Sequence, residues 1–414
     1  MFPLSHMLRR FVQSGCLYVF DPDGKRHVFQ GPEPGPEVTM RLHDRALIWR
    51  LVLNPELAAG EAYMDGTLTF ENGGVAEFLR LFARNRYHLA DHPVQVQMQK
   101  LRLALRRFRS QRINRQKAQK NVAHHYDLNR ELYELFLDRD MQYSCAYFID
   151  PEDTLEQAQE QKKRHIAAKL QLADGQRILD IGCGWGGMAL YLAQCADVDV
   201  LGITLSTEQL DLAMQRAEAA GLADRVRFEL KDYRELDGTF DRIVSVGMFE
   251  HVGTANYWDF FAQLNRLLDP DGVALLHSIG HMSPPSTASP WLDRYIFPGG
   301  YSPALSEVLT AVEPNQLWVT DIEVLRIHYA QTLEEWNRRF QANRARIAEI
   351  YDERFCRMWE FYLISCAQMF RTGAQMVFQM QLAHKRDAVP LTRNYMFENE
   401  RRLAEAGDIA NAAE

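Results

Sequence analysis

The residues best suited to chemistry form a glycine-rich turn near the middle of the chain. The segment ILDIGCGWGG (178–187) predicts a buried strand that runs directly into this turn and then into a helix. Glycines let the backbone pass close to a ligand, and the first amides of a helix can bind it. We therefore expect a nucleotide-like ligand. Taken alone, Gly182, Gly184 and Gly187 would fit a dinucleotide, S-adenosylmethionine (SAM) or a turn that only packs.

The residues around this turn favour SAM. A nicotinamide dinucleotide needs an acidic residue at the carboxyl end of the second strand, about 20 residues after the glycines. That strand ends Gly202-Ile203-Thr204, whereas Asp197 and Asp199 lie at its opposite end. Asp180 before the first glycine and Asp232 after the third strand instead suit the amino-acid part and the adenine of SAM. A dehydrogenase is accordingly disfavoured.

The elements that must position these residues alternate along the chain after Asn121. Such alternation predicts an α/β fold with a doubly wound, mostly parallel sheet. The expected helices are 157–170, 187–193 and 207–220, and the expected strands are 177–181, 198–203, 226–230, 242–246 and 273–277.

The 414 residues are too many for one ordinary core, so we expect two domains. A smaller α+β domain is predicted for residues 1–92, with short β-runs around the turn Asp21-Pro22-Asp23-Gly24. A helical linker is predicted for residues 93–120, and the catalytic domain for residues 121–400.

The predicted linker is strongly basic, because every formal charge between Lys100 and Lys120 is positive. The charges belong to Lys100, Arg102, Arg106, Arg107, Arg109, Arg112, Arg115, Lys117 and Lys120. One interpretation is a surface for anionic lipid headgroups, and the other is an ordinary solvated helix.

Composition excludes several classes of function. A net charge of −8 argues against nucleic acid as the main partner. The six cysteines have neither a CxxC pair nor a metal-ligand spacing to histidine, so we expect reduced cytosolic thiols and no metal site. The first residues contain too short an apolar run for a signal peptide, and no apolar stretch approaches the ~20 residues of a membrane-spanning helix. Any membrane contact is expected to be peripheral.

Together with the glycine-rich turn, several further segments resemble the cyclopropane-fatty-acid synthase family, which includes the mycolic-acid cyclopropane synthases. They are HHYDLNRELYELFLD (124–138), YSCAYF (143–148), GITLSTEQ (202–209), MFEHVG (248–253), LLHSIG (275–280), LRIHYAQTLEEW (325–336) and FYLISCAQMFRTG (361–373). The resemblance covers about residues 120 to 385. It implies a seven-stranded SAM-methyltransferase sheet and a lipid-binding N-terminal domain.

The resemblance also implies which residues form the SAM pocket. They are Tyr143, Ser144, Asp180, Gly182, Gly184, Gly186, Thr204, Leu205, Gln209, Asp232, Tyr233 and Arg234. The segment His124-His125-Tyr126 would begin a helix that closes over SAM, although either histidine could be structural. The aromatic-rich segment 291–301 is expected to form part of an acyl-chain tunnel, with a mobile loop as the alternative.

The expected reaction sets demanding conditions. An isolated alkene is a weak nucleophile, so proximity and electrostatics must help it attack the SAM methyl carbon. A base must then remove a proton so that the ring can close, in a pocket that excludes water. The resemblance implies that this base is a bound bicarbonate ion, held by residues at the positions Cys145, Glu250, His277, Ile279 and Tyr329.

Each of these residues also has a plainer interpretation. His277 could be a core histidine, Glu250 a helix N-cap or a surface residue, and Tyr329 simple packing in an apolar strand-like run. Cys366 matches a cysteine proposed as catalytic in the family, but no covalent enzyme intermediate is needed, and packing in the core is the simpler role.

We therefore expect a cyclopropane-fatty-acyl-phospholipid synthase that acts on unsaturated phospholipid acyl chains at the cytoplasmic face of the membrane. Homodimerisation is expected from the resemblance alone. One alternative is a related SAM-dependent enzyme that methylates the acyl chain without closing the ring. Another is a non-catalytic protein that binds lipid or senses SAM, which the presence of Glu250, His277 and Tyr329 disfavours.

Overall fold

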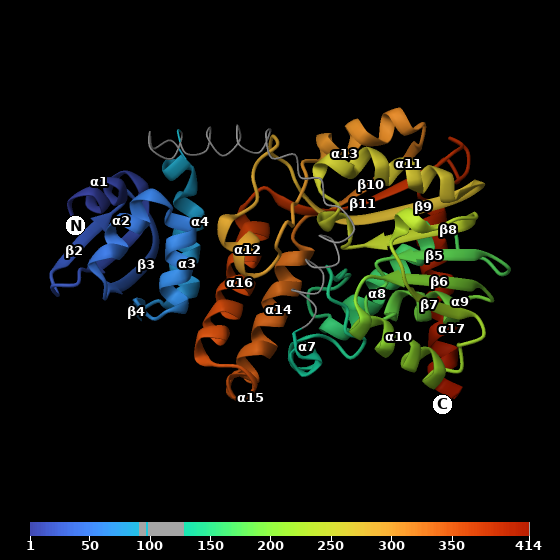
Figure 1. Ribbon diagram of the computed structural model, residues 1–414, viewed down its shortest axis with the longest axis horizontal. Coiled ribbons are helices and arrows are strands. Elements are labelled where there is room, and N and C mark those ends of the chain that lie inside the picture. Colours follow the sequence, from blue (N-terminus) through green and yellow to red (C-terminus); the bar gives the residue numbers. More distant parts are fainter. Residues whose placement is uncertain (91–96, 98–127, 414) are drawn as a thin grey trace. The chain divides into compact units, whose positions relative to one another are not determined.

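A computed structural model describes residues 1–90, 97 and 128–413 of the chain (Figure 1). The basic segment 100–120 and the segment His124-His125-Tyr126 lie outside these residues, and so does most of the predicted linker. The described residues form two compact units. Unit 1 contains the described part of 1–110 with 286–298 and 333–374, and unit 2 contains that of 111–285 with 299–332 and 375–414.

Unit 1 begins with a small α+β fold. Its four-stranded sheet has the order β2-β1-β3-β4, in which β1 pairs parallel to β3 and antiparallel to β2. The elements are α1 (Phe2–Phe11), β1 (Ser14–Phe20), β2 (Arg26–Gln30), β3 (Glu33–Leu42), α2 (Arg45–Leu53), α3 (Pro55–Met64), β4 (Leu68–Asn72) and α4 (Gly74–Ala90). The predicted turn between β1 and β2 forms because the Asp21 carboxylate accepts the amides of Asp23 and Lys25, at 3.1 and 2.9 Å.

Three later helices complete unit 1. They are α12 (Pro290–Tyr295), α15 (Arg344–Ile350) and α16 (Glu353–Thr372), together with the end of α14 (His328–Ala342). The Tyr63 hydroxyl of α3 donates to Glu360 of α16 at 2.7 Å, and Phe361 stacks edge-on against Trp291 of α12. These helices therefore share a core with the N-terminal fold.

Unit 2 is built on a seven-stranded sheet with the order β10-β11-β9-β8-β5-β6-β7. The strands are β5 (Arg177–Ile181), β6 (Asp199–Thr204), β7 (Val226–Leu230), β8 (Phe240–Val246), β9 (Leu268–His281), β10 (Trp318–Leu325) and β11 (Gln375–Ala383). Strands β5 to β9 pair parallel to one another, and β11 pairs antiparallel to both β9 and β10. The predicted mostly parallel, doubly wound sheet is confirmed.

Helices cover both faces of this sheet (Figure 1). One apolar core packs α11 (Tyr257–Leu267) and α13 (Leu305–Val312) against the sheet. The other packs α8 (Leu155–Lys169), α9 (Gly187–Cys195), α10 (Thr207–Ala219) and part of α17 (Asn394–Ala413) against the opposite face. Strand β5 is buried on both faces from Ile178 to Ile181, which explains why Ile178, Leu179 and Ile181 are all apolar. The remaining elements of unit 2 are α7 (Arg130–Phe136) and the short 3-10 helices η1 (Tyr233–Glu235), η2 (Phe249–His251), η3 (Thr254–Asn256) and η4 (Glu313–Asn315).

Candidate active site

The glycine-rich turn lies at the carboxyl end of β5, where ligands bind in open α/β sheets. Gly182 has a φ of +81°, and a Cβ there would lie 2.7 Å from the Cβ of Met248. A side chain at this position would be strained by the positive φ and would collide with Met248. The amide of Gly182 donates to the carbonyl of Ile203 at 2.9 Å, which fixes the turn against β6.

Two adjoining hollows open beside this turn and share Gly182, Gly184 and Gln209. Their empty volumes are about 790 and 510 Å³, solvent at their mouths included. Within them lie eleven of the twelve predicted SAM-binding residues: Tyr143, Ser144, Asp180, Gly182, Gly184, Thr204, Leu205, Gln209, Asp232, Tyr233 and Arg234. The twelfth, Gly186, instead caps α9 and packs close to Phe228.

Asp180 is the residue of this pocket best suited to bind a cationic ligand. It is 1% exposed, and among the described residues its Oδ2 atom has no hydrogen-bond partner. Burial raises the pKa of its carboxyl group to about 7, although the charge of Lys162 opposes this shift. A positively charged group bound here would stabilise the ionised carboxylate. The amino-acid part of SAM fits this requirement.

The other end of the pocket is held by paired polar side chains. Asp232 binds the guanidinium of Arg234 through both carboxylate oxygens, at 2.8 and 2.6 Å. The Thr204 hydroxyl donates to Gln209 at 2.7 Å. These interactions fix the loops after β6 and β7, and His251 also lines this part of the pocket.

Glu250 lies on η2, just after β8, with its carboxylate buried. The backbone amide of Ile279 donates to its Oε1 at 2.7 Å, whereas Oε2 has no partner among the described residues. Burial raises the pKa of Glu250 to about 7. Near neutral pH this group can therefore either accept or donate a proton. The structure brings together the predicted residues Glu250 and Ile279.

His277 lies on β9 on the same face as Ile279, because alternate residues of a strand share a face. It is 2% exposed, and its Nδ1 accepts from the Gln379 side chain at 3.2 Å. Burial lowers the pKa of His277 well below its usual value, so the ring is neutral.

Cys145 and Tyr329 belong to two segments of unit 2 that contact each other. The amide of Ala146 donates to the Thr332 hydroxyl at 3.1 Å, and Thr332 follows Tyr329 by about one turn of α14. The strand-like interpretation of Tyr329 was wrong, because this residue lies in the first turn of a helix. Burial raises the pKa of the Cys145 thiol, which keeps it protonated.

Cys366 belongs to α16 in unit 1, whereas the other five predicted catalytic residues belong to unit 2. Burial raises the pKa of its thiol to about 12, so the thiolate needed for nucleophilic attack is rare at neutral pH. This environment supports a packing role.

Comparisons with known proteins bear on this site. Residues 113–380 match the family model described as mycolic acid cyclopropane synthetase. The cyclopropane-fatty-acyl-phospholipid synthase of Escherichia coli K12 is 41% identical over 336 residues, which are 80% of this chain and 84% of the relative. A Pseudomonas putida protein named "Probable fatty acid methyltransferase" is 38% identical over 347 residues, covering 82% and 85% of the two chains.

This chain belongs to the cyclopropane fatty acid synthase and fatty acid methyltransferase family.

A solved structure of a mycolic acid cyclopropane synthase complexed with SAH and CTAB supports the same assignment. It is 36% identical, with a TM-score of 0.61, and the match covers 64% of this chain and 97% of that one. The chain is therefore a SAM-dependent methyltransferase, as its motifs predicted. No helix among its described residues has the length and apolar character needed to cross a membrane.

Sequence reasoning missed several residues that support the walls of this pocket. Lys162 of α8 is fully buried and donates to the Gln142 side chain at 2.6 Å and to the Ser144 hydroxyl at 2.8 Å. Burial lowers its pKa to about 8. Asp140 accepts from Lys163 at 2.6 Å and also pairs with Arg216. These contacts hold the loop that carries Tyr143 and Ser144. The local sequence, EQKKRH, is typical of a solvated helix face and gives no signal of this role.

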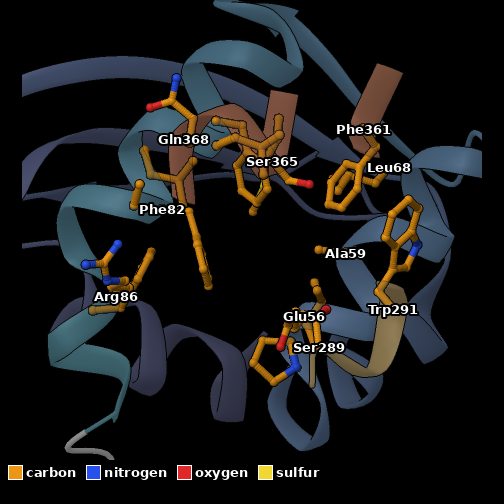
Figure 2. Close-up of a pocket in the computed structure, with 18 of the residues that line it drawn as sticks. Glu56, Ala59, Leu68, Phe82, Arg86, Ser289, Trp291, Phe361, Ser365 and Gln368 are labelled. Carbon is orange, nitrogen blue, oxygen red and sulfur yellow. The ribbon is translucent and has the colours of Figure 1, made fainter. Parts of the chain in front are cut away.

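Unit 1 of the enzyme contains a separate apolar cavity (Figure 2). Its empty volume is about 1120 Å³, solvent at the mouth included. Figure 2 shows Trp291 and Phe361 on one side, Phe82 on the other and Ala59 between them. The walls come from the N-terminal fold together with α12 and α16. Trp291 of the predicted tunnel segment thus lines an apolar cavity.

Proposed function

We propose that this enzyme transfers a methylene unit from SAM to the cis double bond of unsaturated phospholipid acyl chains, forming cyclopropane fatty acids. The observation that carries the proposal is the buried Glu250 carboxylate, with one oxygen held by Ile279 and the other without a described partner. The 41% identical Escherichia coli relative is named for this reaction.

The pocket beside the glycine-rich turn is proposed to bind SAM. Asp180 would bind its ammonium group, and the loops that carry Thr204, Gln209 and Asp232 would enclose its nucleoside. When bound, SAM supplies an electrophilic methyl carbon. The fixed loops and the buried walls orient that carbon and exclude water, which would intercept a cationic intermediate on the acyl chain.

Removal of a proton from the transferred carbon requires a base near Glu250. Since its pKa is about 7, Glu250 can accept a proton itself or hydrogen-bond another proton acceptor. Bicarbonate fits the donors present: a neutral His277 ring, the protonated Cys145 thiol, the Tyr329 hydroxyl and protonated Glu250. We propose that these residues would hold it, and it would supply a proton acceptor.

The apolar cavity of unit 1 is proposed to hold lipid. Ligand pockets are lined mostly by apolar and aromatic side chains, and this cavity has such walls. Unit 1 would act as the lipid-binding part, with the basic segment 100–120 attracting anionic headgroups.

We propose that the enzyme associates peripherally with the cytoplasmic face of the membrane. We also propose that it forms a homodimer, on the basis of the family resemblance alone.

The test is product analysis by gas chromatography and mass spectrometry. Purified protein is incubated with SAM and vesicles of monounsaturated phospholipid, and the acyl chains are then released. A chain one CH2 heavier that contains a ring and no alkene supports the proposal. Unchanged chains, under conditions in which the protein is folded and binds SAM, contradict it.

A second candidate function is methylation of the acyl chain without ring closure. The Pseudomonas putida relative is named for a fatty acid methyltransferase activity and matches 82% of this chain. This candidate predicts a heavier chain that is methyl-branched or bears a methylene group, with no ring.

A further inference from the structure

A row of buried polar side chains leads from His277 away from the active site. His277 Nδ1 contacts Gln379 Nε2 at 3.2 Å, and Gln379 Oε1 contacts Lys169 Nζ at 2.8 Å. Lys169 also pairs with Glu323, which binds His165 Nε2 at 2.6 Å. The first three residues are at most 2% exposed. The row joins β9, β11, α8 and β10 within unit 2.

The chemistry of each group determines the direction of every hydrogen bond in the row. A lysine ammonium can only donate, so it must face the oxygen of the Gln379 amide. The amide nitrogen of Gln379 then faces His277, and this nitrogen can also only donate. His277 Nδ1 must therefore be the acceptor. In a neutral imidazole whose Nδ1 accepts, the proton lies on Nε2.

The ion pair between Lys169 and Glu323 fixes the end of the row that lies away from His277. Glu323 binds both Lys169 and His165, and these two cations lower its pKa to about 2 despite partial burial. Glu323 is thus ionised at neutral pH. Burial lowers the pKa of Lys169, but its ion pair with Glu323 opposes this shift and favours the ammonium form that donates to Gln379. His165 also pairs with Glu400 of α17, and it stacks on Tyr147 at a centroid distance of 4.3 Å.

We propose that Gln379 and Lys169 are positioning residues that hold His277 as the neutral tautomer with its hydrogen on Nε2, and so as a fixed hydrogen-bond donor. The catalytic consequence rests on the proposed function. In this tautomer the ring donates through Nε2 to an anion or a carboxylate in the active site. In the opposite tautomer, Nε2 would carry a lone pair in place of the hydrogen and would repel that anion or carboxylate.

Two substitutions of Gln379 separate this role from packing. In Gln379→Glu the shape is retained, but a carboxylate accepts from both neighbours and selects a hydrogen on His277 Nδ1. In Gln379→Met the chain length is similar and both hydrogen bonds are lost. Gln381→Glu is the matched control, because Gln381 is also buried on β11 and donates to the Lys169 carbonyl and to Tyr395.

The decisive readout is ¹⁵N NMR of histidine-labelled full-length protein, with the His277 signals identified by their absence in His277→Asn. In wild type, His277 is expected to have an unprotonated Nδ1 and a protonated Nε2. In Gln379→Glu, it is expected to have a protonated Nδ1 and an unprotonated Nε2. Gln379→Glu should lower kcat by about 10- to 100-fold while changing the SAM Kd less than threefold, because the misplaced proton affects only the reaction. Gln381→Glu should change thermal stability while leaving the His277 tautomer as in wild type.

A hydrogen on Nδ1 in wild type would overturn the proposal without any variant. A reversed tautomer in Gln379→Glu with unchanged kcat would also overturn it. If wild type shows the expected tautomer but forms no modified acyl chain, the proposed function fails while the tautomer assignment is supported.

Discussion

Asp180 and Glu250 are two buried carboxylates, and each has one oxygen atom without a described partner. Burial raises the pKa of both to about 7. Their neighbours differ, because Asp180 lines the SAM pocket whereas Glu250 is held by an amide of β9. Under the proposed function, the same shift would serve two purposes, recognition of a cation at Asp180 and proton exchange at Glu250.

The shift at Asp180 predicts how SAM binding depends on pH. A cationic ligand needs the ionised carboxylate, so SAM affinity should fall as pH decreases below about 7, by up to about tenfold per pH unit. Above that pH the affinity should level off, and binding near pH 6 should release a proton. Isothermal titration calorimetry in buffers of different ionisation enthalpy measures both effects.

Asp180→Asn should weaken SAM binding by roughly 10- to 100-fold at pH 8, because a hydrogen bond to a charged group contributes ~1.5 to 3 kcal/mol. The variant should also lose the pH dependence. Asp224→Asn, at an exposed position before β7, is the matched control and should bind SAM as wild type does. SAM affinity of the wild type that is constant between pH 5 and 8 would contradict this role.

Glu250→Gln should abolish most turnover while SAM binding is retained. The decrease in kcat should be on the order of 10²- to 10⁴-fold, which is the usual contribution of a positioned acid or base. The folded-state pKa of Glu250 is raised, so the stability it contributes is present at low pH and lost as pH rises through about 7. At pH 8 the variant should thus unfold at a temperature no lower than wild type. Exposed Glu218→Gln is the control, and full activity of Glu250→Gln would remove Glu250 from the mechanism.

At the scale of elements, helices α1 to α4 together with α12 and α16 line the apolar cavity of unit 1. Gly60 of α3 is needed for this packing, since a Cβ there would lie 2.4 Å from the Trp291 ring. One residue earlier, Ala59 faces the cavity (Figure 2). The helices therefore pack closely at one point and leave an apolar space beside it.

Ala59→Trp should partly fill this space. We expect KM for phospholipid vesicles to rise about tenfold, equivalent to about 1.4 kcal/mol, while the SAM Kd is unchanged. Ala219→Trp, at an exposed position on α10, is the control. Steady-state kinetics with thermal melting checks this expectation, and a correctly folded Ala59→Trp with wild-type KM would exclude the cavity as a lipid site.

Strands β5, β6 and β7 were predicted to within one residue, because apolar runs between turn residues mark buried strands. Strand β8 begins two residues earlier than predicted, and β9 extends five residues before and four residues after its predicted bounds. Helix α1 was not predicted, since its sequence at the start of the chain was examined only as a possible signal peptide. Tyr329 was assigned to a strand-like run because β10 ends at Leu325 and α14 begins at His328, which leaves no clear break in the apolar pattern. Local sequence does not determine such boundaries.

Most residues predicted to bind SAM line the same two hollows, and the sequence could group them because they lie in short motifs with fixed spacing. Lys162 and Gln379 could not be found in this way. Lys162 contacts Gln142, 20 residues away, and Gln379 contacts His277, 102 residues away. Their roles depend on which elements the fold brings together, and a single lysine or glutamine in a helix or strand carries no signal of such a partner.

At the scale of the whole molecule, charge is distributed unevenly along the chain. The net charge is −8, yet the nine charges between Lys100 and Lys120 are all positive. Replacing Arg106, Arg107 and Arg109 by Gln should weaken binding to anionic vesicles on the order of 100-fold, given ~1 kcal/mol per basic residue at an anionic surface. The difference in vesicle affinity between wild type and this variant should shrink as the salt concentration rises.

Vesicle flotation at two salt concentrations measures this effect. The control is a triple replacement at the exposed positions Arg227, Arg386 and Arg401, which has the same change in net charge. Equal binding of the two triple variants would assign the basic segment to an ordinary solvated helix.

The central claim concerns what happens to the transferred carbon, and SAM with a fully deuterated methyl group tests it most directly. The enzyme is incubated with this SAM and monounsaturated phospholipid vesicles, and the deuterium atoms in the modified acyl chain are counted by mass spectrometry. The account predicts a saturated ring that retains two deuterium atoms, because a base near Glu250 removes the third. A methyl branch that retains all three would contradict cyclopropanation.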